Sequence, residues 1–338
     1  KEARGGDDRN HEFFRPWVLW DTCWALAPGP SEAFARGLWN HQIGDPETGR
    51  FSRHARWSDH GPATGMDFPR HGGFFIDAWS RAYARTKDPV FLKAIRTLAA
   101  LYGSARNERT GMIPSVTEPV SRTGWPLSNL SLAIDLWAAA GRVPDELARE
   151  LRRQALETDR VFLKIAHDVG RGGQGFVLSC RVHNLEPLGR SARWTTGYGE
   201  HTDAQVANLC ALRYGQLPDG PSKAAYRRLI LACAGRYLDS SPDRQKPIYP
   251  GAVGDAILHL VSAHAIAGDR KYLERAHGFA QTAVAAFLGD GSPLPRASSR
   301  HDHYEAITRA DTLMMALLAL WQTENRPDLK LNLVNTDR

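Results

Sequence analysis

Cysteine, long apolar runs and runs of basic residues are all scarce in this sequence of 338 residues. The four cysteines stand far apart without a Cys-x-x-Cys spacing, so neither a structural zinc site nor a disulfide framework is expected. The longest apolar run, Leu313 to Trp321, has nine residues, whereas roughly 20 are needed to cross a bilayer. This run predicts a buried helix, and we expect no membrane partner.

Basic residues are not clustered, because no run of Lys and Arg reaches five residues. Zinc-finger spacings and aromatic RNA-binding signatures are missing as well, so nucleic acid is not an expected partner. The sequence also lacks a Walker motif, a GxGxxG after a strand, a GxSxG elbow and an HExxH motif. These absences argue against nucleotide-dependent, serine-esterase and zinc-protease functions, and no cofactor is predicted.

What is present suits a folded protein with a large core, since 42% of the residues are hydrophobic and 24% are charged. The 43 Lys and Arg residues exceed the 37 Asp and Glu residues, which gives a net charge of +6. A basic balance favours an anionic partner without naming it, because phosphate, nucleic acid and uronate all qualify.

Apolar residues recur at helical spacing through most of the chain, and strand-like alternation is confined to short stretches beside turns. Ser31 is expected to cap a helix, Pro89 and Pro221 suit first turns, and Gly268 marks a helix end. The pattern predicts an all-α protein. The eleven expected helices are 16–27, 31–43, 72–86, 88–104, 127–140, 144–167, 201–216, 221–238, 251–267, 270–288 and 304–321.

The sequence repeats itself at an offset of 181 residues, and each copy is a helix, a short Asp-containing turn and a second helix. A second echo, at an offset of 62, pairs 45–51 with 107–113, two turns in which Gly is expected to supply a positive φ. Helical hairpins of this size cannot bury their faces alone, so they must stack or close. The pairs at the longer offset are Gly73 and Gly254, Ile76 and Ile257, Asp88 and Asp269, Phe91 and Tyr272, and Leu92 and Leu273.

The long linkers all occur at one phase of this repeat, between the second helix of one hairpin and the first helix of the next. In a closed ring of hairpins they would lie on one rim, which is the expected active face. An open solenoid of the TPR type is the alternative. We therefore expect residues 1–338 to form a single (α/α)6-type toroid or incomplete barrel. The long linkers are 44–71, 105–126, 168–200, 239–250 and 289–303.

The segments AYARTKDPVFL (82–92) and RTGMI (109–113) resemble the hairpins of six-hairpin (α/α) toroid enzymes that act on carbohydrates. This group includes toroid polysaccharide lyases, sugar 2-epimerases and, more distantly, unsaturated glucuronyl hydrolases. The resemblance covers most of the chain at the level of architecture and implies a toroid fold with an activity on sugars. Where the glucuronyl hydrolases carry an Asp before the first inner helix, this chain has Arg-His-Gly-Gly (70–73), and the epimerase motifs are absent.

A first group of candidate site residues ends the linker 44–71. Arg70 can hold a carboxylate through two hydrogen bonds, and His71 precedes two glycines that let a ligand approach. His60 is a further candidate for substrate binding. In the structural alternative, Asp67 and Arg70 form an ion pair and His71 caps the helix.

A second group lies in the linker 168–200, which is longer than connections in compact domains usually are. Trp194 can stack on a sugar ring, and Tyr198 stands between two glycines. In the alternative, Trp194 and Tyr198 anchor a packed loop and Asp203 belongs to the first turn of the next helix. The candidates in and just after this linker are His183, Asn184, Trp194, Tyr198, Glu200 and His201.

The last two candidates of the rim precede the final helix, where His303 and Tyr304 are expected to contact substrate. The alternative for His301 and His303 is a divalent metal site, although no third ligand has a diagnostic spacing. Asn129, near the start of the helix 127–140, either contacts substrate or caps that helix.

A basic rim of this kind suits β-elimination in a uronate-containing polysaccharide. The reaction needs a neutralised carboxylate, a base for the C5 proton and an acid for the leaving oxygen. Toroid polysaccharide lyases use sets of His, Tyr, Asn and Arg residues, and this rim resembles them by residue type. The resemblance implies that Arg, Asn and His neutralise the substrate carboxylate. The predicted catalytic residues are Tyr198, His201, His183 and His71, and the predicted substrate ligands are Arg70, Asn184, Trp194, Asn129, Glu200, His60, His303 and Tyr304.

Three other functions stay open: a glycoside hydrolase of the same fold, an epimerase and a non-catalytic carbohydrate-binding protein. A hydrolase needs two suitably spaced carboxyl groups. We expect an anionic polysaccharide or oligosaccharide as partner and, from that substrate, secretion or periplasmic residence, although no signal peptide precedes Lys1. The candidate carboxylates are Asp67, Glu200, Asp203, Asp255 and Glu305.

Overall fold

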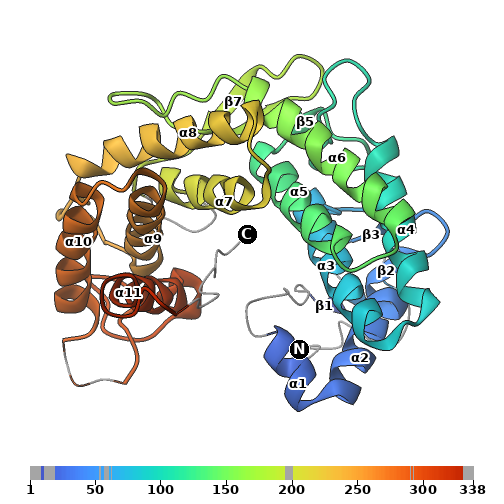
Figure 1. Ribbon diagram of the computed structural model, residues 1–338, viewed down its shortest axis with the longest axis horizontal. Helices are drawn as coiled ribbons and strands as arrows, with labels where there is room; N and C mark the ends of the chain where they lie inside the picture. The colour runs from blue at the N-terminus through green and yellow to red at the C-terminus, as the bar shows by residue number, and fades with distance from the viewer. Residues whose placement is uncertain are drawn as a thin grey trace. The chain divides into compact units, whose positions relative to one another are not determined.

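The computed structural model describes residues 9–10, 20–52, 55–56, 61, 63–194, 201–289, 291 and 293–329. Most of these residues are helical and the strands are short, which confirms the all-α class (Figure 1). The chain divides into two compact units. Unit 1 comprises Lys1–Ile165 and Ser179–Leu188, and unit 2 comprises Ala166–Leu178 and Gly189–Arg338.

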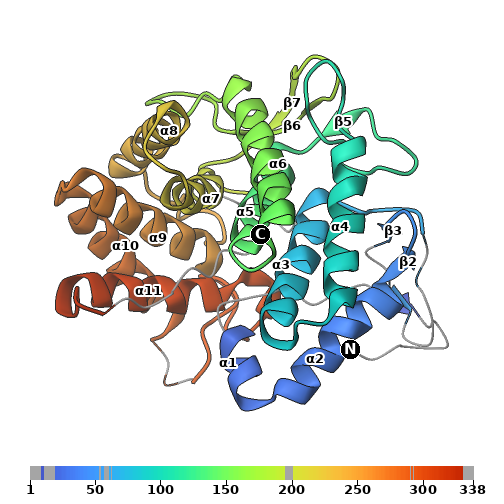
Figure 2. The ribbon, with the colours of Figure 1, turned by 45° about the vertical axis from the view of Figure 1, so that its right-hand side comes forward.

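Unit 1 is built on helical hairpins, with α3 packed against α4 and α5, and α5 packed against α6 (Figure 2). Its core is rich in aromatic side chains: the rings of Trp39 and Trp79 meet edge to face at 5.7 Å, and Trp79 Nε1 donates to the carbonyl of Ala35. The helices are α1 (Trp20–Leu26), α2 (Pro28–Gly37), a π-helical turn η1 (Leu38–Gln42), α3 (Pro69–Thr86), α4 (Pro89–Ser104), α5 (Pro126–Ala140) and α6 (Asp145–Lys164).

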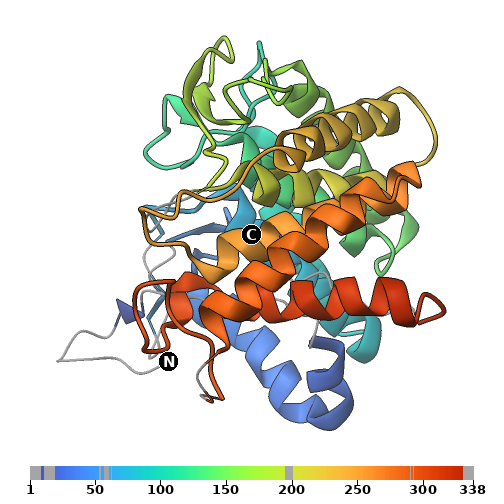
Figure 3. The same ribbon diagram turned by 90° about the vertical axis from the view of Figure 1, so that its left-hand side faces the viewer.

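Unit 2 repeats this organisation, with α9 packed against α7, α10 and α11, and α8 against α7, α9 and α10 (Figure 3). The helices are α7 (Asp203–Gln216), α8 (Pro221–Leu238), α9 (Pro250–Ala267), α10 (Lys271–Phe287), a 3-10 turn η2 (Ala306–Thr308) and α11 (Ala310–Asn325).

The short strands lie in the segments outside the helices. One short pair is β1 (Arg9–Asn10) with β4 (Ala55–Arg56), and another is β2 (Ile43–Asp45) with β3 (Arg50–Phe51). A small three-stranded sheet has the order β5 (Thr123–Gly124), β6 (Val177–Arg181) and β7 (Pro187–Arg190).

The two sequence repeats are confirmed as structural repeats. The α3–α4 and α9–α10 hairpins turn alike: Lys87 and Gly268 end the first helices with φ of 61° and 72°. The carboxylates of Asp88 and Asp269 then accept from the backbone N–H groups of the second helices, at 2.8 Å and 3.0 Å. At the shorter offset, Gly49 and Gly111 both have φ of 78°, as the turn chemistry predicts.

Two predicted helix starts need correction. Ser31 does not cap α2, because the helix begins at Pro28 and the N–H of Ser31 already donates to the carbonyl of Ala27; prolines 28 and 30 fit because a first turn has unsatisfied N–H groups anyway. The last helix begins at Ala310 and not at 304, because Arg309 has φ of 62° and interrupts the preceding 3-10 turn.

The run Leu313–Trp321 is only half buried, contrary to prediction. Leu313 and Leu320 lie in the core, but Leu318 and Trp321 keep 40% and 50% of their surface exposed. A helix that packs on the core with one side leaves its other side facing solvent, even where the residues on that side are apolar. Among the described residues, none of the helices has the length and apolar character that a bilayer span requires. All four cysteines are free thiols.

Candidate active site

In unit 1, α3 and α5 run parallel and their N-terminal ends lie side by side. The backbone N–H of Arg70 donates to Oγ of Ser128 across 2.9 Å, and both residues belong to first turns. The residues that precede these helices therefore gather at one end of the pair.

Asp67 fixes this end of unit 1. Its side chain is 1% exposed and accepts from the N–H of Thr117 at 2.8 Å and from the Thr117 hydroxyl. Tyr102 donates to the carbonyl of Asp67 at 2.8 Å. Burial raises the pKa of the Asp67 carboxyl group. Because both oxygens are engaged inside the protein, Asp67 ties the 117 loop to the start of α3.

Arg70 and His71 are neighbours in space as well as in sequence. Arg70 Nε lies 3.4 Å from His71 Nε2, and its guanidinium lies over the ring of Phe68. His71 is 1% exposed and contacts the rings of Phe68 and Phe74, at 5.1 Å and 6.3 Å. The more exposed member of this pair is therefore the arginine, and its contact with substrate stays a prediction.

Asn129, in the first turn of α5, is held by the preceding loop. Its amide nitrogen donates to the carbonyls of Ile113 and Trp125, and its oxygen accepts from the N–H of Ile113 at 3.1 Å. The side chain is 2% exposed. These bonds give Asn129 a structural task, and its contact with substrate stays a prediction.

His183 and Asn184 lie in the exposed turn between β6 and β7. The Asn184 side chain accepts from the N–H of Glu186 at 3.1 Å, a bond that stabilises the turn. The sequence indicates neither this hairpin nor its exposure.

In unit 2, Asp255 in the N-terminal half of α9 contacts both α7 and the residue that precedes α11. Asn208 of α7 donates to the carbonyl of Asp255 at 3.1 Å. Arg309, just before α11, makes two bonds of 2.9 Å to the Asp255 carboxylate. The starts of α9 and α11 therefore lie close together, as those of α3 and α5 do in unit 1.

Most carboxylates considered for a hydrolase are buried structural groups. Asp203 and Asp255 are both 0% exposed. Asp203 accepts from the hydroxyl of Ser191 and lies 3.3 Å from Arg236, while Asp255 is held by Arg309. With Asp67 buried as well, three of the five candidate carboxylates are engaged in contacts inside the protein.

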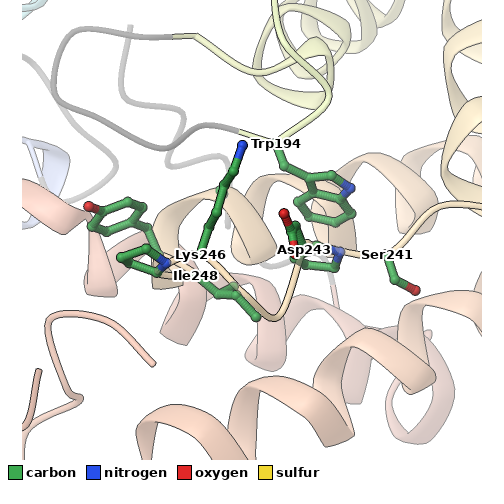
Figure 4. Close-up of a pocket in the computed structure, with 9 residues that line it drawn as sticks. Trp194, Ser241, Asp243, Lys246 and Ile248 are labelled. Atoms are coloured by element: carbon green, nitrogen blue, oxygen red, sulfur yellow. The ribbon is translucent and has the colours of Figure 1, made fainter. Parts of the chain in front are cut away.

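Trp194 stands at the edge of a pocket in unit 2 with a volume of about 170 Å³ (Figure 4). Its indole Nε1 donates to Oγ of Ser240 at 2.8 Å, and its ring meets those of Tyr237 and Phe279 edge to face, both at 5.3 Å. These three contacts fix the ring on the pocket wall. The pocket is lined by Trp194, Ser241, Pro242, Asp243, Lys246, Pro247, Ile248, Tyr249 and Ala252.

The loop that forms the rest of the pocket is held by two arginines. Arg275 donates to the carbonyls of Tyr237 and Ser240, where the loop leaves α8. Arg300 donates to the carbonyl of Gln245. At the far end, Ile248 and Ser299 exchange bonds of 2.9 Å and 3.0 Å. These bonds attach the pocket loop to α10 and to the segment that precedes α11.

His201 lies at the start of α7, on a segment that is bonded to the Trp194 segment. The N–H of Ala192 donates to the carbonyl of His201 at 3.2 Å. His201 Nδ1 lies 2.8 Å from Oε1 of Gln205. This contact orients the His201 ring at the start of the helix.

His303 and Tyr304 lie in the loop before α11 and are well exposed. His303 Nε2 is 3.5 Å from the carboxylate of Glu305, and His301 Nδ1 is 2.7 Å from Oγ of Ser298. Within the described ranges, no three His, Cys, Asp or Glu side chains are grouped so that they could hold a metal ion.

The structure therefore brings Trp194 and His201 onto bonded segments in unit 2, and Arg70 and His71 into contact in unit 1. Three further candidates, Tyr198, Glu200 and His60, lie outside the described residues. Sequence reasoning missed the pocket residues Asp243, Lys246 and Tyr249. The sequence feature that could have indicated them is the long linker 239–250, from which no candidate residue was selected.

No protein-family model matches the sequence, and no curated protein does either. Solved structures do match. A D-mannose isomerase is similar with a TM-score of 0.62 and 10% identity over 90% of this chain and 84% of that chain. A sugar epimerase from a ruminal bacterium gives 0.60 and 13% identity over 91% and 85%. The cellobiose 2-epimerase of Bacillus thermoamylovorans B4167 gives 0.59 and 10% over 88% and 84%.

At such low identity these likenesses show the fold, which is that of the (α/α)6 toroid class. The resemblance inferred from the hairpin sequences is confirmed at this level, because the similar structures are toroid enzymes that process sugars.

Proposed function

We propose that the protein is an enzyme that removes a proton from a sugar carbon next to a carbonyl or carboxyl group. The observation that carries this proposal is that Trp194, on the pocket wall, and His201 belong to segments of unit 2 that are joined by the bond from the N–H of Ala192 to the carbonyl of His201. Trp194 supplies a fixed aromatic surface on which a sugar ring can stack. His201 supplies an imidazole group, the side chain that most often acts as a general base, and the contact of its Nδ1 with Gln205 orients the ring.

The size of the pocket limits what it can bind. A volume of about 170 Å³ is below the roughly 300–1,000 Å³ of most ligand pockets. It therefore suits one sugar ring, either a free sugar or the end of a longer chain.

The reaction we favour is isomerisation or epimerisation at C2 of a reducing sugar. In both reactions a base withdraws the proton beside the carbonyl, and the proton returns to another position or to the opposite face. The support for this choice is the likeness to an isomerase and two epimerases over most of the chain.

The second candidate is the β-elimination expected from the sequence. It begins with the same step, because the C5 proton of a uronate lies next to a carboxylate. The net charge of +6 and the lysine in the pocket favour it. In this reaction Tyr198 keeps its predicted catalytic role, and a polymer substrate would go with secretion or periplasmic residence.

One experiment separates the two reactions. The purified chain is incubated in D2O with mannose, cellobiose and uronate oligosaccharides, and deuterium at C2, ketose formation and near-ultraviolet absorbance are measured. Deuterium at C2 with a new epimer or ketose establishes isomerisation or epimerisation, and rising absorbance with new reducing ends establishes elimination.

Variants of single histidines test the base. His201→Ala is expected to lower turnover by about 10²–10⁴-fold, the usual contribution of general base catalysis. The matched control is His277→Ala, which removes an exposed histidine of α10 that pairs with Glu324 at 2.7 Å. Full turnover by His201→Ala, or no reaction of the parent protein with any of these sugars, would contradict the proposal.

A further inference from the structure

The pocket beside Trp194 carries two charged side chains of opposite sign that do not neutralise each other. Asp243 and Lys246 both line it, and both are exposed. One Asp243 oxygen accepts from the N–H of Gln245 at 2.9 Å. No ion pair within 4 Å joins Lys246 to a carboxylate in the part of the chain that the structure describes.

Lys246 is the one cation among the residues that line the pocket. Figure 4 shows the Lys246 side chain extending away from its loop, with Asp243 drawn between it and the Trp194 ring in this view. Its ammonium group is thus available to an anionic group on a ring that stacks on Trp194.

The position of Lys246 is fixed by its loop. The N–H of Lys246 donates to the carbonyl of Asp243 at 3.1 Å, and Arg300 holds the carbonyl of the preceding residue, Gln245. Arg275 and Arg300 are used in these backbone bonds, so they hold the pocket together and leave the recognition of charge to Lys246.

We propose that this pocket selects sugars that carry a carboxylate, with Lys246 as the group that recognises the charge. The carboxylate pairs with the Lys246 ammonium group, the ring stacks on Trp194, and Asp243 accepts hydrogen bonds from ring hydroxyls. The inference rests on the proposed function in one respect, that the pocket binds a sugar. It assigns charge recognition to Lys246 of unit 2, a residue that the sequence analysis did not select.

The test compares the binding of methyl glucuronide with that of methyl glucoside, which differ in the carboxylate alone. Dissociation constants are measured by NMR titration for the parent protein and four variants. Lys246→Gln is expected to weaken glucuronide binding by about two- to fivefold, the range of an exposed ion pair, and to leave glucoside binding unchanged. Trp194→Ala is expected to weaken the binding of both sugars.

Two further variants sharpen the result. Asp243→Asn removes a negative charge. It is expected to weaken glucoside binding and to increase the preference of the pocket for glucuronide over glucoside. Lys271→Gln makes the same charge change as Lys246→Gln but lies at the start of α10, where Lys271 pairs with Asp269. It is expected to change the binding of neither sugar.

Several outcomes would overturn the inference: a parent protein that binds glucoside as tightly as glucuronide, equal losses for both sugars in Lys246→Gln, or unchanged binding in Trp194→Ala. These readouts are independent of turnover. Selective binding without any reaction supports the inference and refutes the proposed reaction, whereas turnover of neutral sugars without preference for glucuronide does the reverse.

Discussion

His259 is buried in the middle of α9 without the hydrogen bonds that a histidine normally makes. Its side chain is 0% exposed, and neither ring nitrogen has a hydrogen-bond partner within the described part of the chain. The ring of Tyr237 lies 6.0 Å away, edge to face. Burial lowers the pKa of His259 to about 3, so the ring stays neutral in the folded protein.

This histidine makes stability depend on pH in a defined direction. In the unfolded chain its pKa returns to 6.5, so between about pH 6.5 and 3 the unfolded state binds the additional proton. Stability is therefore fully present above pH 6.5 and falls by about 1.4 kcal/mol per pH unit below it. His259→Leu is expected to remove this slope. Urea unfolding at pH 7 and pH 5 measures it, and an equal loss in parent and variant would show that other groups cause the acid sensitivity.

At the scale of elements, glycine sets how closely the helices of each unit approach. A Cβ atom on Gly254 of α9 would lie 2.7 Å from the backbone nitrogen of Leu313 in α11. Its repeat partner, Gly73 of α3, would place a Cβ 2.7 Å from the Asp135 carboxylate and 3.2 Å from Cα of Leu132 in α5. The 181-residue repeat thus encodes a helix–helix contact as well as a turn.

Gly254→Ala is therefore expected to destabilise unit 2. The neighbouring atoms are backbone, so the helices must move apart, and overpacking of this kind costs about 1–3 kcal/mol. The matched control is Gly235→Ala in α8, where a Cβ would meet no atom within 4 Å. That change is expected to stabilise by about 0.5–1 kcal/mol, the usual gain of Ala over Gly in a helix. Thermal unfolding compares the two, and equal stability of both variants would contradict the close contact.

The elements that sequence reasoning predicted well are those whose chemistry is local. The turns at Asp88 and Asp269 follow from an N-cap, and those at Gly49 and Gly111 follow from a positive φ, so a few residues determine each. The limits of α2 and α11 were predicted less well, because first-turn prolines and the unusual backbone of Arg309 moved them.

The candidate site was predicted only in part, because it depends on contacts between distant segments. Trp194 could be chosen as an aromatic residue of a long linker that is suited to stacking on a sugar ring. Lys246 could not be chosen, since its place in the pocket depends on Arg300, 54 positions further along the chain. The buried pairing of Asp255 with Arg309 likewise joins residues far apart in sequence, and no local pattern distinguishes it from a catalytic carboxylate.

At the scale of the whole molecule, charge acts over a longer range than any single contact. The excess of 43 basic over 37 acidic residues gives a net charge of +6 and a pI of about 9.2. Such a charge attracts anions before they touch the protein and speeds their association. Salt shortens this range, since the Debye length falls from about 30 Å at 0.01 M to about 10 Å at 0.1 M ionic strength.

The two ligands of the binding test should therefore respond differently to salt. Glucuronide binding is expected to weaken steadily as NaCl is raised from about 0.01 M to about 0.1 M and beyond, because both the ion pair to Lys246 and the attraction by the net charge are screened. Glucoside binding should stay constant, since stacking on Trp194 involves no net charge. Lys246→Gln should reduce the salt dependence for glucuronide without abolishing it, because the other basic residues remain. NMR titrations at three salt concentrations measure both ligands, and an equal salt response of the two would mean that the pocket recognises the sugar without regard to its charge.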